Sequence, residues 1–163
     1  MTGGRTVVVV GGCRTPFLRS GTGYVDLMAY ELGAMALAGL LQRYRIDPAV
    51  VDRVILGTVL GEPRTTNLAR EAALACGIPP SCPAFTVTAA CASSNVAIQS
   101  GVEAIACGAA DVVIAGGVET LSDVPIRFGR EVRKRMIQSQ KAKGLAECSV
   151  QNPDSLFYTL HSL

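Results

Sequence analysis

The chain has 163 residues, of which 49% are hydrophobic and 17% charged, with 15 Lys and Arg against 13 Asp and Glu. This composition excludes a disordered chain, and a formal net charge of +2 gives no overall electrostatic argument for a nucleic-acid partner. The 17 glycines lack the strict three-residue period of collagen, which excludes a fibrous protein.

The first predicted elements are a buried strand and a long helix. Residues 7–10 are four consecutive valines followed by two glycines. An unbroken β-branched run is typical of a strand buried on both faces, so we expect it to lie at the centre of a sheet. Residues 24–44 are rich in Leu, Met and Ala, which predicts a helix that ends before Asp47 and Pro48.

Three further predicted strands alternate with two predicted helices. The strands are the apolar runs at residues 51–60, 85–88 and 112–115. The helices cover residues 67–76, with Asn67 as N-cap, and residues 93–107, and a glycine follows each of them. Strands and helices that alternate at this spacing predict an α/β fold, with helices on both faces of a mostly parallel sheet.

Residues 72–102 carry no charged side chain, a length that could span a membrane. Three prolines and several Thr, Ser and Asn residues interrupt the segment, so we interpret it as protein interior and predict no transmembrane segment. Residues 1–10 are also too short for a secretory signal of the usual form. We therefore expect a cytoplasmic protein with reduced cysteines.

The chain changes character after residue 124. Residues 125–144 hold seven Lys or Arg and a single Glu. We interpret this basic segment as a solvated loop; the alternative is a site for the phosphates of CoA or for an anionic membrane surface. Residues 145–163 form a tail without a predicted element. Four strands with no further closing element would leave a sheet edge exposed, which favours association with another chain.

The six cysteines include no Cys-x-x-Cys pair, and His161 is the only histidine, so we predict no metal site. Cys91 differs from the others because it lies where the third predicted strand passes into the helix at 93–107. A thiol there faces the positive end of a helix dipole, which favours the thiolate, and small neighbours leave it accessible to an acyl chain. A buried structural cysteine is the alternative that local sequence leaves open.

Several short blocks together resemble the N-terminal half of a thiolase. They are RTPF at 14–17, GTV at 57–59, NLAR at 67–70, CAS at 91–93 and AGGVETLS at 115–122. The resemblance covers residues 6–144 and is strongest to the β-subunit type of the trifunctional complex of fatty-acid oxidation. Residues 1–124 would then be the core of the thiolase N-terminal domain, and 125–144 the start of its loop region.

The resemblance implies that Cys91 is the acyl-accepting nucleophile. It would attack the 3-keto carbonyl of a 3-ketoacyl-CoA, release acetyl-CoA and pass the shortened acyl group to a second CoA. CoA would be a co-substrate, with no resident cofactor. The expected partners are a second copy of the chain, a complementing C-terminal half or a β-oxidation multienzyme complex, and not nucleic acid.

The resemblance also implies features that this sequence lacks. Thiolases have a second half with further catalytic His, Asn and Cys residues, and no matching block occurs here, so the C-terminal domain is absent from the chain. This leaves two alternatives to an active thiolase: a catalytically inactive truncated or split fragment that serves as an assembly partner, and a ketoacyl-synthase-like condensing enzyme.

The remaining residues of these blocks have plainer interpretations. We expect Pro16 and Gly57 to shape turns, and Gly116 and Gly117 to permit close packing at a strand end. Glu119 and Arg70 are a candidate ion pair, across the site or across a dimer contact; the alternative is that each charge is solvated or structurally paired, and neither residue is predicted to be catalytic. The cysteines that lack an activating neighbour in the sequence, and are therefore predicted to be inert, are Cys13, Cys76, Cys107 and Cys148.

Overall fold

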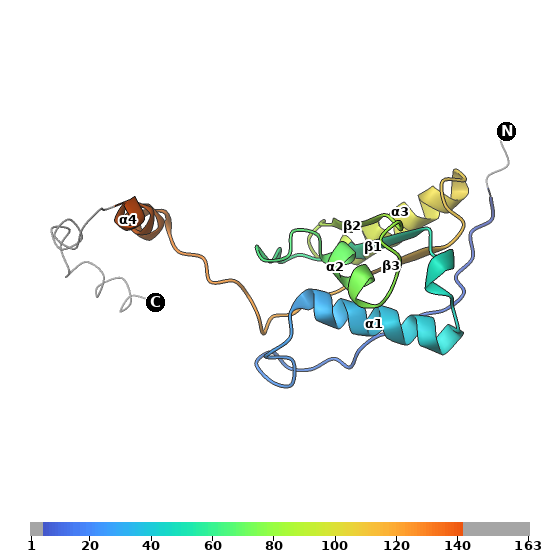
Figure 1. Ribbon diagram of the computed structural model, residues 1–163, viewed down its shortest axis with the longest axis horizontal. Coiled ribbons are helices and arrows are strands. Elements are labelled where there is room, and N and C mark those ends of the chain that lie inside the picture. Colours follow the sequence, from blue (N-terminus) through green and yellow to red (C-terminus); the bar gives the residue numbers. More distant parts are fainter. Residues whose placement is uncertain (1–4, 142–163) are drawn as a thin grey trace. The chain divides into compact units, whose positions relative to one another are not determined.

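The computed structural model describes residues 5–141, and contacts divide the chain into two units, one ending at Pro125 and the other beginning at Ile126. The described part of the first unit holds a parallel sheet and its covering helices (Figure 1). The described part of the second unit holds helix α4 (Arg130–Lys141). The tail at 145–163 lies outside the described residues, as do Cys148 and His161.

The sheet has three strands in the order β2-β1-β3, and both pairs are parallel. Strand β1 (Arg53–Gly57) is central, between β2 (Ala84–Val87) and β3 (Val113–Gly117). Its residues are apolar and buried after the first, and Val54 and Ile55 are fully enclosed. Burying a side chain of this size contributes roughly 1.5–3 kcal/mol, so β1 is a principal source of stability.

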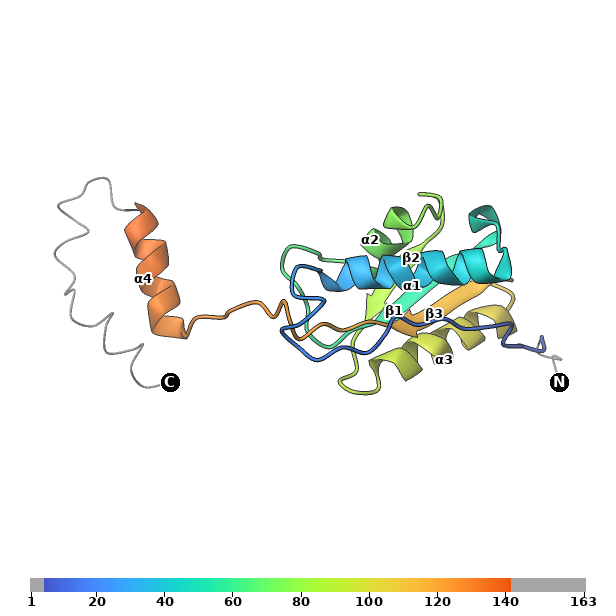
Figure 2. The same cartoon turned by 90° about the horizontal axis from the view of Figure 1, so that it is seen from below.

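Helices cover both faces of the sheet, which confirms the predicted α/β class. Figure 2 shows α1 (Ala29–Tyr44) and α2 (Leu68–Ala75) on one side and α3 (Ser93–Ala106) on the other. A 3₁₀ turn at Pro48–Val50 connects α1 to β1. The main core lies between α1, α2 and the sheet, and its buried members include Leu37, Leu41, Val54, Leu56, Ala69, Ala72 and Ile78.

The predicted helix ends are largely confirmed. The Asn67 side chain accepts a hydrogen bond from the Arg70 backbone N–H at 3.2 Å and so caps α2. Gly77 and Gly108 follow α2 and α3 with φ of +88° and +77°, a conformation that favours glycine. Helix α1 begins five residues later than predicted, because the Glu31 carboxylate accepts a hydrogen bond from the Met28 backbone N–H and fixes the start there.

The predicted strand at residues 7–10 is wrong. This segment is extended but pairs with no strand among the described residues, and Val8, Val9 and Val10 are 70%, 90% and 79% exposed. A β-branched run forms a strand only when a neighbouring strand supplies hydrogen-bond partners. Strand β1 takes the central position that was expected for residues 7–10.

The prediction of a solvated loop at residues 125–144 is also wrong in part, because residues 130–141 form α4. Arg, Lys, Met and Gln are good helix formers, and Lys134 forms an ion pair with Glu131 at 3.1 Å, one turn apart. Among residues 5–141, no helix is both long and apolar enough to cross a membrane.

Two glycines let the ends of β1 and β3 approach the first turn of α3. A Cβ atom built on Gly57 would meet the Ser93 carbonyl, with its oxygen at 2.6 Å, and the Ser94 nitrogen at 2.6 Å. A Cβ atom on Gly117 would collide with the Ser94 hydroxyl. Gly117 therefore permits close packing, as predicted, and Gly57 does so as well instead of shaping a turn. The same prediction for Gly116 is wrong, because a Cβ atom there would have nothing within 4 Å.

Substitution Gly57→Ala should destabilise the chain, because the added methyl group meets backbone atoms that cannot move aside independently. We expect a loss of about 1–3 kcal/mol in the free energy of unfolding, measured by urea denaturation. Gly61→Ala is the matched control, since a Cβ atom there has nothing within 4 Å. Equal stabilities of the two variants would contradict this packing.

Candidate active site

The three parallel strands end at one edge of the sheet, and the candidate site lies there. In open α/β sheets, the carboxyl ends of the strands are where ligands bind. Residues after β1, β2 and β3 form a hollow of about 270 Å³ at this edge. It is lined by Gly57, Thr58, Val59, Ala90, Cys91, Ser93, Ser94, Gly117, Val118 and Glu119.

Cys91 lies in the tight turn between β2 and α3, and its side chain is exposed. The buried Ser93 holds this turn together: its hydroxyl donates to the Ala90 carbonyl at 2.6 Å and accepts from the Ala89 N–H at 2.8 Å. Ala90 has φ of +49°, which is uncommon for a residue other than glycine. The structure thus presents the Cys91 thiol at the N-terminal end of α3, as predicted.

Glu119 connects the segment after β3 to the segment after β1. Its carboxylate accepts hydrogen bonds from the Val59 N–H at 2.7 Å, the Leu60 N–H at 3.3 Å and the Thr58 hydroxyl at 3.3 Å. The Thr58 carbonyl in turn accepts a hydrogen bond from the Thr88 hydroxyl, just before the Cys91 turn. No signal in the sequence indicates this arrangement, because two of the donors to Glu119 are backbone groups and all of them lie 59 to 61 positions away along the chain.

The suggested pair of Glu119 and Arg70 does not form. The Arg70 guanidinium instead donates to the carbonyls of Cys82 at 2.9 Å and Pro80 at 2.8 Å. Arg70 therefore holds the turn that precedes β2, at a distance from the site along the chain. The contacts described for Arg70 are therefore structural.

A second charged link joins the loops that follow β1 and β3. Arg64 forms ion pairs with Glu62 at 2.8 Å and with Asp123 at 2.5 Å. The side-chain hydrogen bond from Arg64 lowers the pKa of Glu62 to about 2. The Glu62 carboxylate is therefore ionised at neutral pH, and its pairing with Arg64 weakens only as the pH falls toward 2.

Two other cysteines are disfavoured as nucleophiles by their surroundings. Burial raises the pKa of the Cys76 thiol, and burial together with the nearby Asp52 carboxylate raises that of Cys82. Since the thiolate is the reactive form, both residues should react slowly. This agrees with the expectation that Cys76 is inert.

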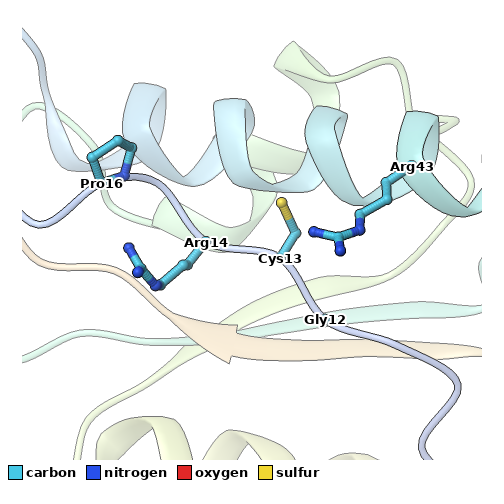
Figure 3. Close-up of a pocket in the computed structure, with 5 residues that line it drawn as sticks. All are labelled: Gly12, Cys13, Arg14, Pro16 and Arg43. Carbon is cyan, nitrogen blue, oxygen red and sulfur yellow. The ribbon is translucent and has the colours of Figure 1, made fainter.

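A second hollow, of about 730 Å³, surrounds Cys13 on the extended segment beside α1 (Figure 3). The Arg43 side chain extends from α1 toward the Cys13 sulfur, while Arg14 points away from it. The Arg14 guanidinium lies 5.0 Å from the Phe17 ring centroid. Cys13 therefore has a cationic neighbour that the sequence did not reveal, although it lies outside the sheet and its strand ends.

We place the candidate site at the smaller hollow, because there three strand ends and a helix N-terminus fix the position of the thiol. The Cys13 segment is instead held by tyrosine hydroxyls: the Gly12 N–H donates to the Tyr44 hydroxyl at 3.3 Å, that hydroxyl donates to the Gly12 carbonyl at 3.4 Å, and the Tyr24 hydroxyl donates to the Pro16 carbonyl at 3.0 Å. Within residues 5–141, no three His, Cys, Asp or Glu side chains lie close enough to hold a metal ion.

Residues 7–156 match the family model described as the N-terminal domain of thiolase. The chain belongs to the thiolase family. The match includes the Cys91 turn and all three strands, and it extends past residue 144, where the resemblance noted in the sequence ended. Membership in this family also agrees with the strand-turn-helix context of Cys91.

Similar proteins include the mitochondrial trifunctional enzyme subunit beta of Homo sapiens, 54% identical over 143 residues, which are 88% of this chain and 30% of that protein. A probable 3-ketoacyl-CoA thiolase of Caenorhabditis elegans is 50% identical over 84% of this chain and 31% of its own length. The crystal structure of Bacillus anthracis acetyl-CoA acetyltransferase has a TM-score of 0.76 at 32% identity, covering 80% of this chain and 33% of that one. The chain thus spans about a third of the length of these relatives.

We predict that Cys91 is the most reactive thiol among the described residues. Limiting iodoacetamide should label it ahead of the more buried Cys76 and Cys82, whose raised pKa values disfavour the thiolate. Peptide mapping by mass spectrometry measures the order of labelling. First labelling of Cys82 would contradict the assignment, and first labelling of Cys13 would move the site to the other hollow.

Proposed function

We propose that this chain carries the acyl-accepting part of a thiolase-type acyltransferase, with Cys91 as the nucleophile and CoA as co-substrate. The observation that carries the proposal is the position of Cys91: an exposed thiol at the N-terminus of α3, beside the ends of three strands, within the thiolase match. The relatives named 3-ketoacyl-CoA thiolase and acetyl-CoA acetyltransferase support acyl transfer to and from CoA.

The proposed reaction has two steps. The Cys91 thiolate attacks the 3-keto carbonyl carbon, and the bond between carbons 2 and 3 breaks, so that acetyl-CoA leaves after carbon 2 takes up a proton. A second CoA then attacks the resulting thioester as its thiolate, which releases a shortened acyl-CoA and restores the Cys91 thiolate. Division of the transfer between two nucleophilic steps lowers the barrier of each.

The local structure supplies two contributions to these steps. The N-terminal end of α3 directs a positive partial charge and backbone N–H groups toward the thiolate and toward an oxyanion formed on the substrate. The neighbouring residues Ala90 and Ala92 are small and exposed, so an acyl chain can approach the sulfur. Fixed donors of this kind stabilise charge that develops during the reaction.

A second candidate is an inactive fragment that acts as an assembly partner. Its support is that the matched residues span 30% of the length of the human relative. A ketoacyl-synthase-like activity receives less support, because the relatives are named as thiolases and an acetyltransferase.

The setting that we propose is fatty-acid β-oxidation, in a multienzyme complex. Its support is the name of the human relative, a trifunctional enzyme subunit. That relative is mitochondrial, which favours a mitochondrial location over the cytoplasmic one predicted from the sequence.

The isolated 163-residue chain should show little or no thiolysis, whereas residues 1–144 joined to the C-terminal half of a relative should recover it. Each missing proton-transfer group typically costs on the order of 10²–10⁴ in rate. The measurement is the loss of 3-ketoacyl-CoA absorbance after CoA is added.

Cys91→Ala in the joined protein is the decisive control, with Cys107→Ala as the matched variant at another exposed cysteine. We expect activity to vanish in the first and persist in the second. Thiolysis that persists in Cys91→Ala would contradict the mechanism, and ordinary turnover by the isolated chain would contradict the need for a second half.

The chain should also self-associate. Residues 8–10 expose three valines, and β3 is a sheet edge without a further strand among the described residues. Size-exclusion chromatography with light scattering should give a dimer or larger species, and Val9→Lys should shift it toward monomer. Val50→Lys, at an exposed valine in the 3₁₀ turn, is the control, and a monomeric wild-type chain would contradict the prediction.

A further inference from the structure

Glu119 follows β3. All of the hydrogen bonds described for its side chain come from the segment that follows β1. The carboxylate is exposed, yet it accepts from two consecutive backbone N–H groups, Val59 and Leu60, and from the hydroxyl of Thr58. The bond to Val59, at 2.7 Å, has the short length of a charge-assisted hydrogen bond. One side chain thereby fixes three successive residues.

Two of these three residues, Thr58 and Val59, form part of the wall of the hollow that contains Cys91. Thr58 and Val59 line it together with Cys91, and Glu119 lines it as well. Thr58 also contacts the strand that leads to the nucleophile, since its carbonyl accepts the Thr88 hydroxyl hydrogen bond. A continuous set of hydrogen bonds thus runs from Glu119 through Thr58 to the residue three positions before Cys91.

The backbone adds a second constraint in the same place. The Val118 N–H donates to the Gly57 carbonyl at 3.0 Å, and the Thr58 N–H donates to the Val87 carbonyl at 3.1 Å. The three strand ends are therefore linked as far as Thr58. Beyond that residue, the hydrogen bonds described for the Val59 and Leu60 N–H groups go to the Glu119 carboxylate.

We propose that Glu119 is a positioning residue for Cys91: its carboxylate holds residues 58–60, and so fixes Thr58 and Val59 as the wall against which the acyl donor is aligned with the thiol. The proposal rests on the acyl-transfer function proposed above. The geometry gives Glu119 no contact with the Cys91 sulfur, so its effect is on alignment of the reacting atoms. Misalignment by about 1 Å can reduce a rate on the order of 10²-fold.

The test uses the full chain and a graded pair of variants. Glu119→Ala removes both carboxylate oxygens, whereas Glu119→Gln keeps one acceptor oxygen and loses the charge. Glu103→Ala is the matched control, because Glu103 is an exposed α3 carboxylate whose side chain accepts a hydrogen bond from Gln99 at 2.9 Å. Far-UV circular dichroism and thermal unfolding confirm that each variant is folded.

Two quantities are measured: amide hydrogen exchange at Val59 and Leu60, and the rate at which acetyl-CoA acylates Cys91 in a single turnover. We expect Glu119→Ala to lose the protection of both amides and to acylate on the order of 10–10²-fold more slowly. Glu119→Gln should fall between Glu119→Ala and wild type, and Glu103→Ala should match wild type. A merely structural role would change the melting temperature of Glu119→Ala and leave the ratio of its acylation rate to that of the wild type unchanged.

The outcomes separate this inference from the proposed function. A wild-type chain that is not acylated at Cys91 contradicts the proposed acyl transfer. In that case two other measurements decide the positioning role: the protection of the Val59 and Leu60 amides, and the rate at which iodoacetamide alkylates Cys91 relative to Cys107. Folded Glu119→Ala with unchanged amide protection, or with wild-type acylation or relative alkylation, overturns the role of Glu119.

Discussion

The arrangement of this domain depends on the close contact between the ends of β1 and β3 and the first turn of α3. Gly57 and Gly117 make that contact possible, because any side chain at either position would overlap with Ser93 or Ser94. The contact brings the N-terminus of α3, with Cys91 before it, to the edge where the strands end. The same glycines therefore serve packing and the placement of the thiol, so the fold and the candidate site share one steric constraint.

Hydrogen bonds fix the segments that surround Cys91. Ser93 closes the turn around Cys91, and Glu119 holds the segment after β1 opposite to it. Arg64 adds a second link between the loops that follow β1 and β3, through Glu62 and Asp123. Exposed ion pairs contribute little to stability on their own, so the value of these links lies in fixing the geometry of the loops.

Local patterns were sufficient to predict α1, α2, α3 and three of the four expected strands, because their apolar periodicity, caps and glycine stops are encoded within each segment. They failed at residues 7–10, where four valines satisfy every local criterion for a strand but no described strand pairs with them. The position of Cys91 at a helix N-terminus was predictable, since it depends on one strand-to-helix junction. The contacts of Glu119 were not predictable, since they join residues 59 to 61 positions apart.

In the proposed function, the sheet edge presents Cys91 as an acyl acceptor. The most direct measurement is to incubate the chain with acetyl-CoA and locate the acetyl group by peptide mass spectrometry. We predict a thioester on Cys91 that hydroxylamine removes, and free CoA in equal amount. A chain that is acetylated first at another cysteine, or that releases no CoA while folded, would contradict the proposed function.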